Sequence, residues 1–287
     1  NCNFMLNIIM FIISSINYER EIIKMVNSTS ILFMAIAFAI QFFFPIALAI
    51  YFYRREKISI GILFTGVLVF LVSQIIIRIP LLKLAQNTPW YRNLESNHIF
   101  ILYLLLALTA GLFEESGRYL GFKFIFKIKN KLEWKSGLAL GIGHGGLESI
   151  YISTSNINNI IISLMINAGT FDSIIAPLLP SETVQYIKDQ LINTQPALFL
   201  AGGLERLFTM FIQIGLSMIV LYSVKNRKAI YLLLAIILHT LVNLLSVYIA
   251  EYFGVWGAEL FIGLVAAASI ILVFKSRKYF EDEVESI

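Results

Sequence analysis

Seven polar side chains interrupt apolar segments of this 287-residue chain, and their types suit acid–base chemistry. In chain order they are Glu114, Glu115, Arg118, His144, Glu148, His239 and Asn243. Charged groups at bilayer depth are costly even on the scales that treat them most leniently, so they are seldom retained there without a function. These residues therefore predict a functional site inside a membrane.

The spacing of these residues follows the turn of an α-helix. Three pairs of residues are four positions apart: Glu114 with Arg118, His144 with Glu148, and His239 with Asn243. Residues at this spacing lie on the same face of a helix. Each pair can therefore act as a unit.

The depths of the ionisable residues within their segments also match. At about 1.5 Å per residue from the nearest flanking lysine, Glu114 and His144 lie roughly 13 Å into their segments and His239 roughly 16 Å. Three helices would thus place one carboxylate and two imidazoles at nearly the same level. We expect the three side chains to meet in one polar cavity.

A site of this composition could carry out hydrolysis. A carboxylate or an imidazole can take a proton from water. A second imidazole and an amide can donate hydrogen bonds to the oxyanion that develops at a scissile carbonyl. Arg118 can keep a neighbouring carboxylate ionised, although Glu115 and Arg118 could instead form a purely structural ion pair.

Zinc chemistry is an open alternative. The chain has no His-Glu-x-x-His sequence, which is the usual zinc protease spacing. Glu114, His144 and His239 could nevertheless assemble a two-histidine, one-carboxylate zinc site from three helices. Two other classes also fit these groups: an ion- or proton-coupled transporter, and a non-catalytic immunity or scaffold protein that binds a peptide without cleaving it.

Further polar residues and glycines near these positions have structural interpretations. Glu205 and Arg206 are expected to form a structural pair or part of a cavity mouth. The glycines that surround His144 predict close helix packing, or room for water and a peptide backbone beside the imidazole: Gly141, Gly143, Gly145 and Gly146.

The composition indicates the class of protein. The chain is 58% hydrophobic and only 14% charged, with a mean hydropathy of +0.80, whereas a soluble domain carries roughly a quarter charged residues. Continuous apolar stretches of about 20 residues are long enough to cross a bilayer. We predict an all-α, polytopic membrane protein with about seven transmembrane helices around an intramembrane polar cavity. The single Cys2 excludes an intramolecular disulfide, and the dispersed net charge of +4 does not indicate nucleic-acid binding.

The apolar segments and their flanking charges predict a topology. We expect spans at about 30–53, 58–78, 99–122, 136–153, 197–224, 229–250 and 255–274. Fourteen of the 22 Lys and Arg residues fall on one side of this arrangement and six on the other. The positive-inside rule then places the N-terminus outside and the C-terminus in the cytoplasm.

Two regions lie outside this scheme. Residues 157–168 are apolar but too short to span, which predicts a re-entrant or interfacial helix before a longer loop at 170–196. Residues 1–24 are expected to be an N-terminal extension. The domain organisation that follows is a single peptidase-like domain at 25–275 and an acidic cytoplasmic tail at 276–287.

The three polar motifs resemble those of a known family. Ala110–Leu120, Gly141–Glu148 and Leu238–Asn243 are similar to the motifs of the CAAX protease and bacteriocin-processing superfamily. Within it, the chain most resembles the YhfC family of bacterial membrane peptidases over about residues 25–275. One position departs from the superfamily pattern, because Leu140 stands where a phenylalanine is usual.

The resemblance implies a glutamate-type intramembrane endopeptidase of the bacterial cytoplasmic membrane, with a membrane peptide or protein as substrate and no required metal. By this analogy, Glu114 and His144 would activate water. His239 and Asn243 would stabilise the oxyanion, and the rest of the first motif would support Glu114. Our leading hypothesis is peptide-bond hydrolysis near the cytoplasmic side of the bilayer, with zinc-dependent proteolysis by the same residues as the alternative.

Overall fold

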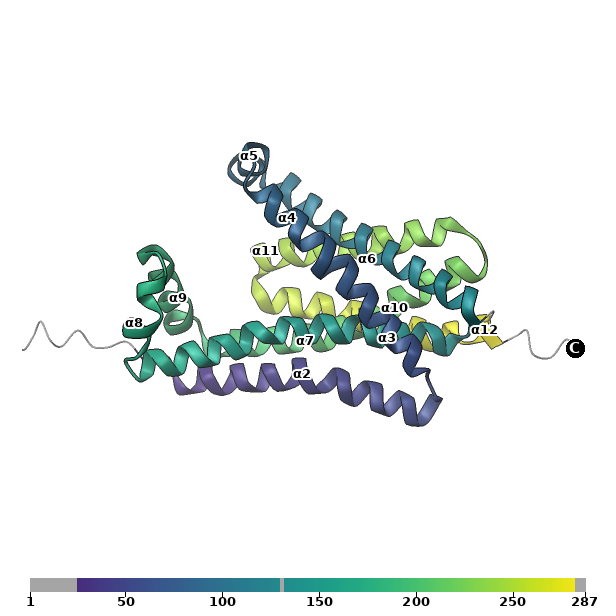
Figure 1. Ribbon diagram of the computed structural model, residues 1–287, viewed down its shortest axis with the longest axis horizontal. Helices are drawn as coiled ribbons and strands as arrows, with labels where there is room; N and C mark the ends of the chain where they lie inside the picture. Colours follow the sequence, from purple (N-terminus) through teal and green to yellow (C-terminus); the bar gives the residue numbers. More distant parts are fainter. Residues whose placement is uncertain (1–24, 130–131, 282–287) are drawn as a thin grey trace, which may run out of the picture.

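The computed structural model describes residues 25–129 and 132–281, and within these ranges its regular elements are all helices (Figure 1). Five of them are long and apolar enough to cross a membrane, or six if α7 is counted with the bent segment that follows it. The protein is therefore an all-helical, polytopic membrane protein, as predicted. The five are α2 (Ser28–Glu56), the run of α3 (Ile60–Phe70), η1 (Leu71–Arg78) and α4 (Ile79–Gln86), α6 (Ile99–Lys129), α10 (Pro196–Lys225) and α11 (Ala229–Ser276).

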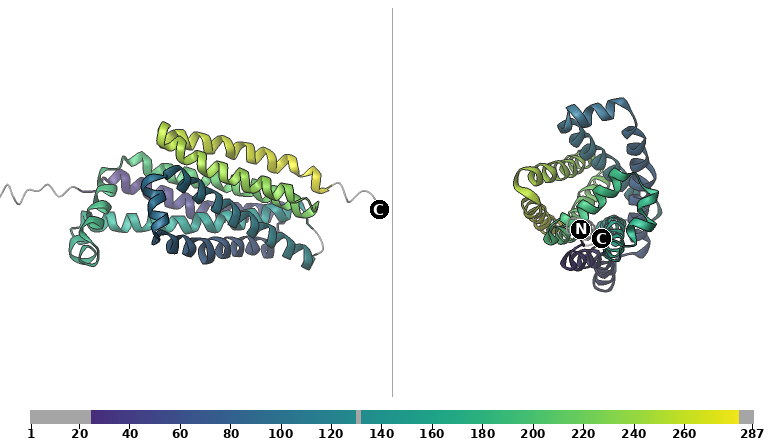
Figure 2. Two further views of the ribbon diagram at one scale, coloured as in Figure 1. Left: turned by 90° about the horizontal axis from the view of Figure 1, so that it is seen from above. Right: turned by 90° about the vertical axis from the view of Figure 1, so that its left-hand side faces the viewer.

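The last of these, α11, is broken into two arms. Gly254 has φ 76° and ψ 172°, a backbone conformation that is essentially restricted to glycine. The chain reverses there, and the two arms run side by side in both views (Figures 1 and 2). They correspond to the spans predicted at 229–250 and 255–274. Six of the seven predicted segments lie within one helix or one arm of α11, and the segment 58–78 covers α3 and η1 apart from its first two residues.

The helix that carries His144 is longer than predicted. α7 runs without interruption over Trp134–Asn167, so residues 157–168 do not form a separate re-entrant or interfacial helix. Polar side chains bond back to their own helix, as Ser153 Oγ does to the Ile150 carbonyl (2.7 Å) and Ser163 Oγ to that of Asn159 (2.7 Å). Because these hydroxyl groups are satisfied internally, the helix can continue through a polar stretch.

The loop expected at 170–196 contains short helices. The chain bends by 104° after α7 into α8 (Phe171–Ile174) and η2 (Ala176–Leu178), and α9 (Ser181–Asn193) follows. Proline punctuates each step: η2 contains Pro177, Pro180 precedes α9, and Pro196 begins α10. This matches the expectation that no single helix passes through the region.

Close backbone contact joins α7 to α3. A Cβ atom at Gly143 would lie 2.0 Å from the Leu63 carbonyl oxygen, and one at Gly66 would lie 2.1 Å from that of Leu140. Only glycine allows two helices to approach this closely. Gly143 therefore packs α7 against α3 beside His144, whereas a Cβ atom at Gly141 or Gly145 would meet α10, at Ile214 (2.8 Å) or Gln213 (3.0 Å).

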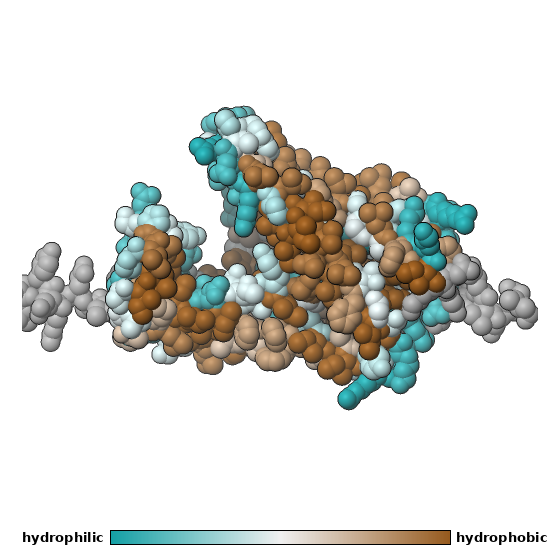
Figure 3. Space-filling view, in the orientation of Figure 1, coloured by the Kyte–Doolittle hydropathy of each residue, from teal (hydrophilic) through white to brown (hydrophobic). Residues whose placement is uncertain are grey.

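The two ends of the bundle are formed by different short helices. The short helix α5 (Pro89–Asn97) lies at the same end as α8 and α9, whereas α12 (Lys278–Glu281) lies at the opposite end (Figure 1). Hydrophilic side chains gather at the ends, and apolar ones cover the face between them (Figure 3). The predicted extension, residues 1–24, and the last part of the predicted tail lie outside the described residues, and the division into domains stays a prediction.

Candidate active site

Three helices bring one carboxylate and two imidazoles together inside the bundle. His144 Nε2 on α7 lies 2.9 Å from Glu114 Oε2 on α6, and His239 Nε2 on α11 lies 3.9 Å from the same oxygen. The three residues are only 0–5% exposed. The depths that match along the sequence thus correspond to a meeting point in the structure, while the catalytic roles of these residues stay predictions.

His144 is held by its neighbours on one side and leaves one nitrogen free. The Phe70 ring meets the imidazole edge to face, with the ring centroids 5.3 Å apart and an interplanar angle of 83°. Nδ1 of His144 has no hydrogen-bond partner among the described residues. Nε2 is therefore the ring nitrogen through which His144 engages the site.

His239 is oriented by a second carboxylate. Its Nδ1 lies 2.7 Å from Glu115 Oε1. Because an ionised carboxylate can only accept a hydrogen bond, Nδ1 carries the proton of this contact, and Nε2 is the ring nitrogen on the Glu114 side. The carboxylate–histidine arrangement is one that proteins use to orient an imidazole that ligates a metal or moves a proton.

Arg118 connects the carboxylates of its own helix to α10. The side chain is fully buried, and it donates to Glu115 and Gln213 and, over 3.4 Å, to Glu114 Oε2. A guanidinium group at this depth balances the charge of the neighbouring carboxylates. The ion pair between Glu115 and Arg118 that the sequence suggested is present, and Arg118 also contacts Glu114. Its role in supporting Glu114 during a reaction stays a prediction.

Glu148 faces α10, where two side chains hold it. Arg206 Nη1 donates to Glu148 Oε1 over 2.8 Å, and Gln213 Nε2 donates to Oε2 over 2.6 Å. The same Gln213 amide nitrogen lies 3.3 Å from Glu114 Oε2, so it bridges the two carboxylates. Arg206 also donates to Glu205, which means that the expected Glu205–Arg206 pair exists but extends to Glu148.

The sequence pattern did not point to one member of this network, Gln213, or to one contact, that between Arg206 and Glu148. The available signal for Gln213 was its polarity within an apolar span, which is a weak one because a neutral amide costs less to bury than a charge. For Arg206 the signal was absent, because its partner depends on how α7 and α10 are rotated against each other.

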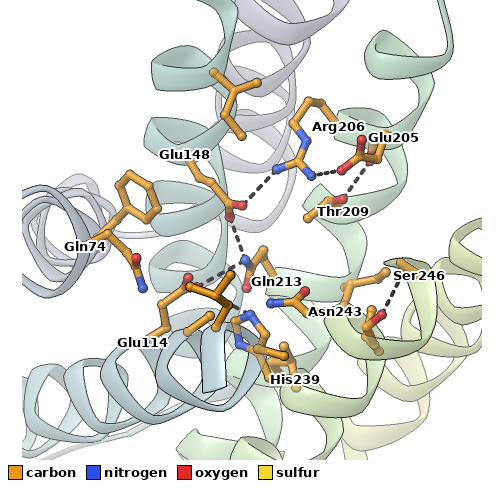
Figure 4. A pocket seen from close by; sticks show the side chains of 18 of the residues that line it. Gln74, Glu114, Glu148, Glu205, Arg206, Thr209, Gln213, His239, Asn243 and Ser246 are labelled. Carbon is orange, nitrogen blue, oxygen red and sulfur yellow. Dashed lines mark hydrogen bonds and ion pairs between the residues drawn. The ribbon is translucent and has the colours of Figure 1, made fainter. Parts of the chain in front are cut away.

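A cavity of about 550 Å³ adjoins these groups, between η1, α6, α7, α10 and α11. Glu114, Glu148, His239 and Asn243 line it, and Figure 4 shows the Asn243 amide directed into it. The α6 residues on its wall run from Tyr103 to Glu114. The cavity therefore extends from the carboxylate cluster towards the α5 end of the bundle, away from the α12 end.

The donor atoms of the cluster are close enough to share a metal ion. The ligand atoms of Glu114, His144 and Glu148 all lie within 4.8 Å of one another. Zinc binds nitrogen and oxygen at about 2.0–2.2 Å, so the donors of one tetrahedral ion are roughly 3.4 Å apart. One imidazole and two carboxylates at these separations fit a divalent ion, whereas the zinc set expected from sequence contained His239 in place of Glu148.

The fold and the site together define a polytopic helical membrane protein with a buried glutamate–histidine centre. Residues 40–274 match the family described as YhfC intramembrane metalloprotease. The chain is also 35% identical over 266 residues to a Bacillus subtilis (strain 168) protein described as "Uncharacterized membrane protein YhfC", covering 90% of this chain and 100% of that protein. No solved structure matches the chain. The chain belongs to the YhfC family, and the resemblance seen in its motifs is confirmed.

The family description bears on the choice between the two protease mechanisms. The leading hypothesis from sequence was a metal-free, glutamate-type enzyme, with a zinc protease as the alternative. The word metalloprotease in the family description and the buried Glu114, His144 and Glu148 donor set favour the alternative.

Proposed function

We propose that this protein is a metal-dependent intramembrane peptidase that hydrolyses a peptide bond of a membrane peptide or protein. The observation that carries the proposal is the convergence of Glu114, His144 and Glu148 within 4.8 Å, with both carboxylates on the wall of a cavity inside the bundle. The family description supports the same class of reaction.

Glu114, His144 and Glu148 would hold the metal, and zinc is the proposed ion because it binds both imidazole nitrogen and carboxylate oxygen. When bound there, the ion would supply Lewis acidity to the scissile carbonyl and to water. Gln213 would hold both carboxylates in place through its amide nitrogen. Arg118 and Arg206 would limit the repulsion between them.

His239 lies outside this donor set and would move the proton. Its Nε2 faces the Glu114 carboxylate, where it could accept a proton from water and return it to the leaving amine. Glu115, bonded to Nδ1, would keep the ring in the productive tautomer and stabilise the imidazolium that forms. Asn243 would donate a hydrogen bond from the cavity wall to the substrate.

One contact favours the metal-free mechanism as a second candidate. His144 Nε2 and Glu114 Oε2 lie at direct hydrogen-bond distance, 2.9 Å, which is the contact needed for a glutamate–histidine pair that activates water by itself. A metal held by these two atoms would replace that hydrogen bond. The two mechanisms therefore differ in one measurable respect, namely whether a chelator abolishes activity.

A comparison of membrane peptides tests the proposal. Peptides from membranes of cells with the wild-type protein are compared with those from cells with Glu114→Ala, and Glu182→Ala, on the exposed surface of α9, is the matched control. We expect cleavage products that disappear with Glu114→Ala and persist with Glu182→Ala. Isolated membranes treated with 1,10-phenanthroline should lose the same products, and added zinc should restore them.

The outcomes separate the candidates. Products that survive chelation but require Glu114 would support the metal-free mechanism over the metal-dependent one. Products that are identical in wild-type and Glu114→Ala membranes, with both proteins present at equal levels, would rule out peptidase activity at this site.

A further inference from the structure

A buried amide on η1 has a hydrogen-bond donor with no partner. Gln74 is only 3% exposed, lines the cavity, and its Nε2 makes no hydrogen bond within the described part of the chain. Buried polar groups in native proteins are nearly always paired, and an unpaired one calls for an explanation such as a water or a ligand. Gln74 therefore offers a free donor to whatever occupies the cavity.

The orientation of this amide is fixed by Arg78, four residues further along. Arg78 Nη1 donates to Gln74 Oε1 over 3.0 Å, and Arg78 is itself held by the Leu106 carbonyl (2.7 Å) and Thr109 Oγ1 (3.2 Å). Because a guanidinium group can only donate, it must face the amide oxygen. The amide nitrogen is therefore the donor left without a partner, on a side chain that lines the cavity.

Gln74 lies beside the carboxylate cluster. Phe70, one turn earlier, packs against the His144 ring. The neighbouring Ser73 lies against Gly117 on α6, three residues from Glu114, where a Cβ atom would come within 3.3 Å of the serine Cβ. Figure 4 shows the Gln74 amide pointing towards Glu114 across the cavity. The π-helical geometry of η1 is itself frequent at functional sites.

We propose that Gln74 Nε2 donates a hydrogen bond to the carbonyl oxygen of the scissile peptide bond, with Arg78 as the positioning residue that directs it. This inference rests on the proposed function. Glu114 and Glu148 can only accept hydrogen bonds when ionised, so the donors that stabilise a developing oxyanion must come from other walls of the cavity. Gln74 supplies one from η1, opposite the donor that Asn243 supplies from α11.

Steady-state kinetics of the purified protein in detergent micelles with zinc test this assignment, with fluorescently labelled casein as the probe. Gln74→Met keeps the length of the side chain and removes the donor, and removal of one such donor lowers kcat by about 10²–10³-fold. We expect that loss with KM within about twofold of wild type, since the contact strengthens as the oxyanion forms. Zinc content should stay at the wild-type level.

Two further variants distinguish a loss of kcat that is due to the missing donor from one that is due to misfolding. Gln41→Met is the matched control, because Gln41 is equally buried on α2 but bonds to the Gly202 carbonyl and to Asn156, away from the cavity. Its kcat should stay near wild type. Gln74→Glu keeps an oxygen for Arg78 but has no donor when ionised, so it should lose kcat as Gln74→Met does.

Three results would overturn the inference. A wild-type kcat for Gln74→Met, or a loss no larger than that of Gln41→Met, would remove Gln74 from the reaction while the proposed function stands. A rise in KM alone would place Gln74 away from the scissile carbonyl. Absence of zinc-dependent casein cleavage by the wild-type protein would count against the proposed function itself, and with it against this role of Gln74.

Discussion

Single residues in this site are constrained by the cost of burying charge. Arg118 and Glu115 are 0% exposed, and each makes a contact beyond their ion pair. Arg118 donates to Gln213, and Glu115 accepts a hydrogen bond from His239 Nδ1. A buried ion pair is a poor source of stability, but the loss of one partner leaves the other charge uncompensated. Substitutions can therefore separate the contribution of this pair to stability from its contribution to activity.

The first prediction concerns this pair. Glu115→Gln should lower the free energy of unfolding by about 3–5 kcal/mol, because Arg118 then lacks its nearest counter-charge. The double variant Glu115→Met with Arg118→Met should recover most of that stability, because both charges are gone. It should still be inactive, because His239 has lost the acceptor for its Nδ1 proton. Denaturation in mixed detergent micelles measures stability; equal or additive losses in the double variant would contradict the structural half of the prediction.

The second prediction concerns the amide that bridges two carboxylates. Gln213→Met removes the donor to Glu148 and Glu114 at nearly constant side-chain volume. Replacement of a group that orients metal ligands typically costs about 10–100-fold in metal affinity, and we expect a loss in that range. Competition with a zinc-chelating dye measures it, with Gln41→Met as the control. Unchanged affinity would mean that these carboxylates do not hold the metal.

The sequence predicted some residues of the site and not others for a physical reason. Glu114, His144 and His239 could be found because ionisable groups in apolar spans are rare and because depth along a helix can be counted from the chain. The contacts of Glu148 could not, because they depend on the rotation of α10, which no spacing within one helix determines. Gln74 and Gln213 are neutral, so their burial gives little signal until their partners are known.

At the scale of elements, contact between the α3 and α7 backbones sets the position of His144. Hydropathy and length predicted where the spans lie. They did not predict that α7 continues to Asn167. Hydroxyl groups such as that of Ser163 donate to carbonyls of their own helix, so the helix tolerates more polar side chains than hydropathy alone suggests. Nor did they identify Gly143 as a contact point over the other glycines nearby, since that depends on which face of α7 meets α3.

The third prediction tests this helix contact. In Gly143→Ala the new methyl group would meet the Leu63 carbonyl oxygen at 2.0 Å and the Leu63 carbonyl carbon at 2.9 Å. Backbone atoms cannot rotate away as a side chain can, so the helices must separate, and overpacking of this kind costs about 1–3 kcal/mol. Activity should fall as well, because separation of the helices would displace His144, which is the next residue. Thermal unfolding in detergent micelles measures the loss.

Gly202→Ala is the matched control for that variant. It also lies within a long helix, α10, but a Cβ atom there would have no neighbour within 4 Å. Alanine stabilises a helix interior relative to glycine by roughly 0.5–1 kcal/mol, so this variant should be slightly more stable than wild type. Equal behaviour of the two variants would show that Gly143 is not a point of helix contact.

At the scale of the whole molecule, the cavity extends away from the end of the bundle that carries most of the basic residues described. α2, α6 and α10 end, and α7 begins, at the α12 end of the bundle, and the basic residues of the connections lie there. The cavity extends the other way, towards α5. If the positive-inside rule holds, the substrate reaches Glu114 from the outer half of the membrane, although the sequence alone suggested cleavage near the cytoplasmic side.

The fourth prediction is therefore the orientation of the bundle, and accessible cysteines at its two ends test it. In a Cys2→Ser background, Glu182→Cys on α9 and Tyr279→Cys on α12 each place one thiol at an exposed position. Because the described helix ends and connections at the α12 end carry basic residues such as Lys123, Lys225 and Lys275, the positive-inside rule places that end in the cytoplasm. In spheroplasts, a membrane-impermeant maleimide should label Glu182→Cys at once and Tyr279→Cys only after the membrane is permeabilised. The reverse pattern would show the opposite topology, with the cavity in the cytoplasmic half of the membrane. Cleavage would then occur near the cytoplasmic side, as the sequence suggested.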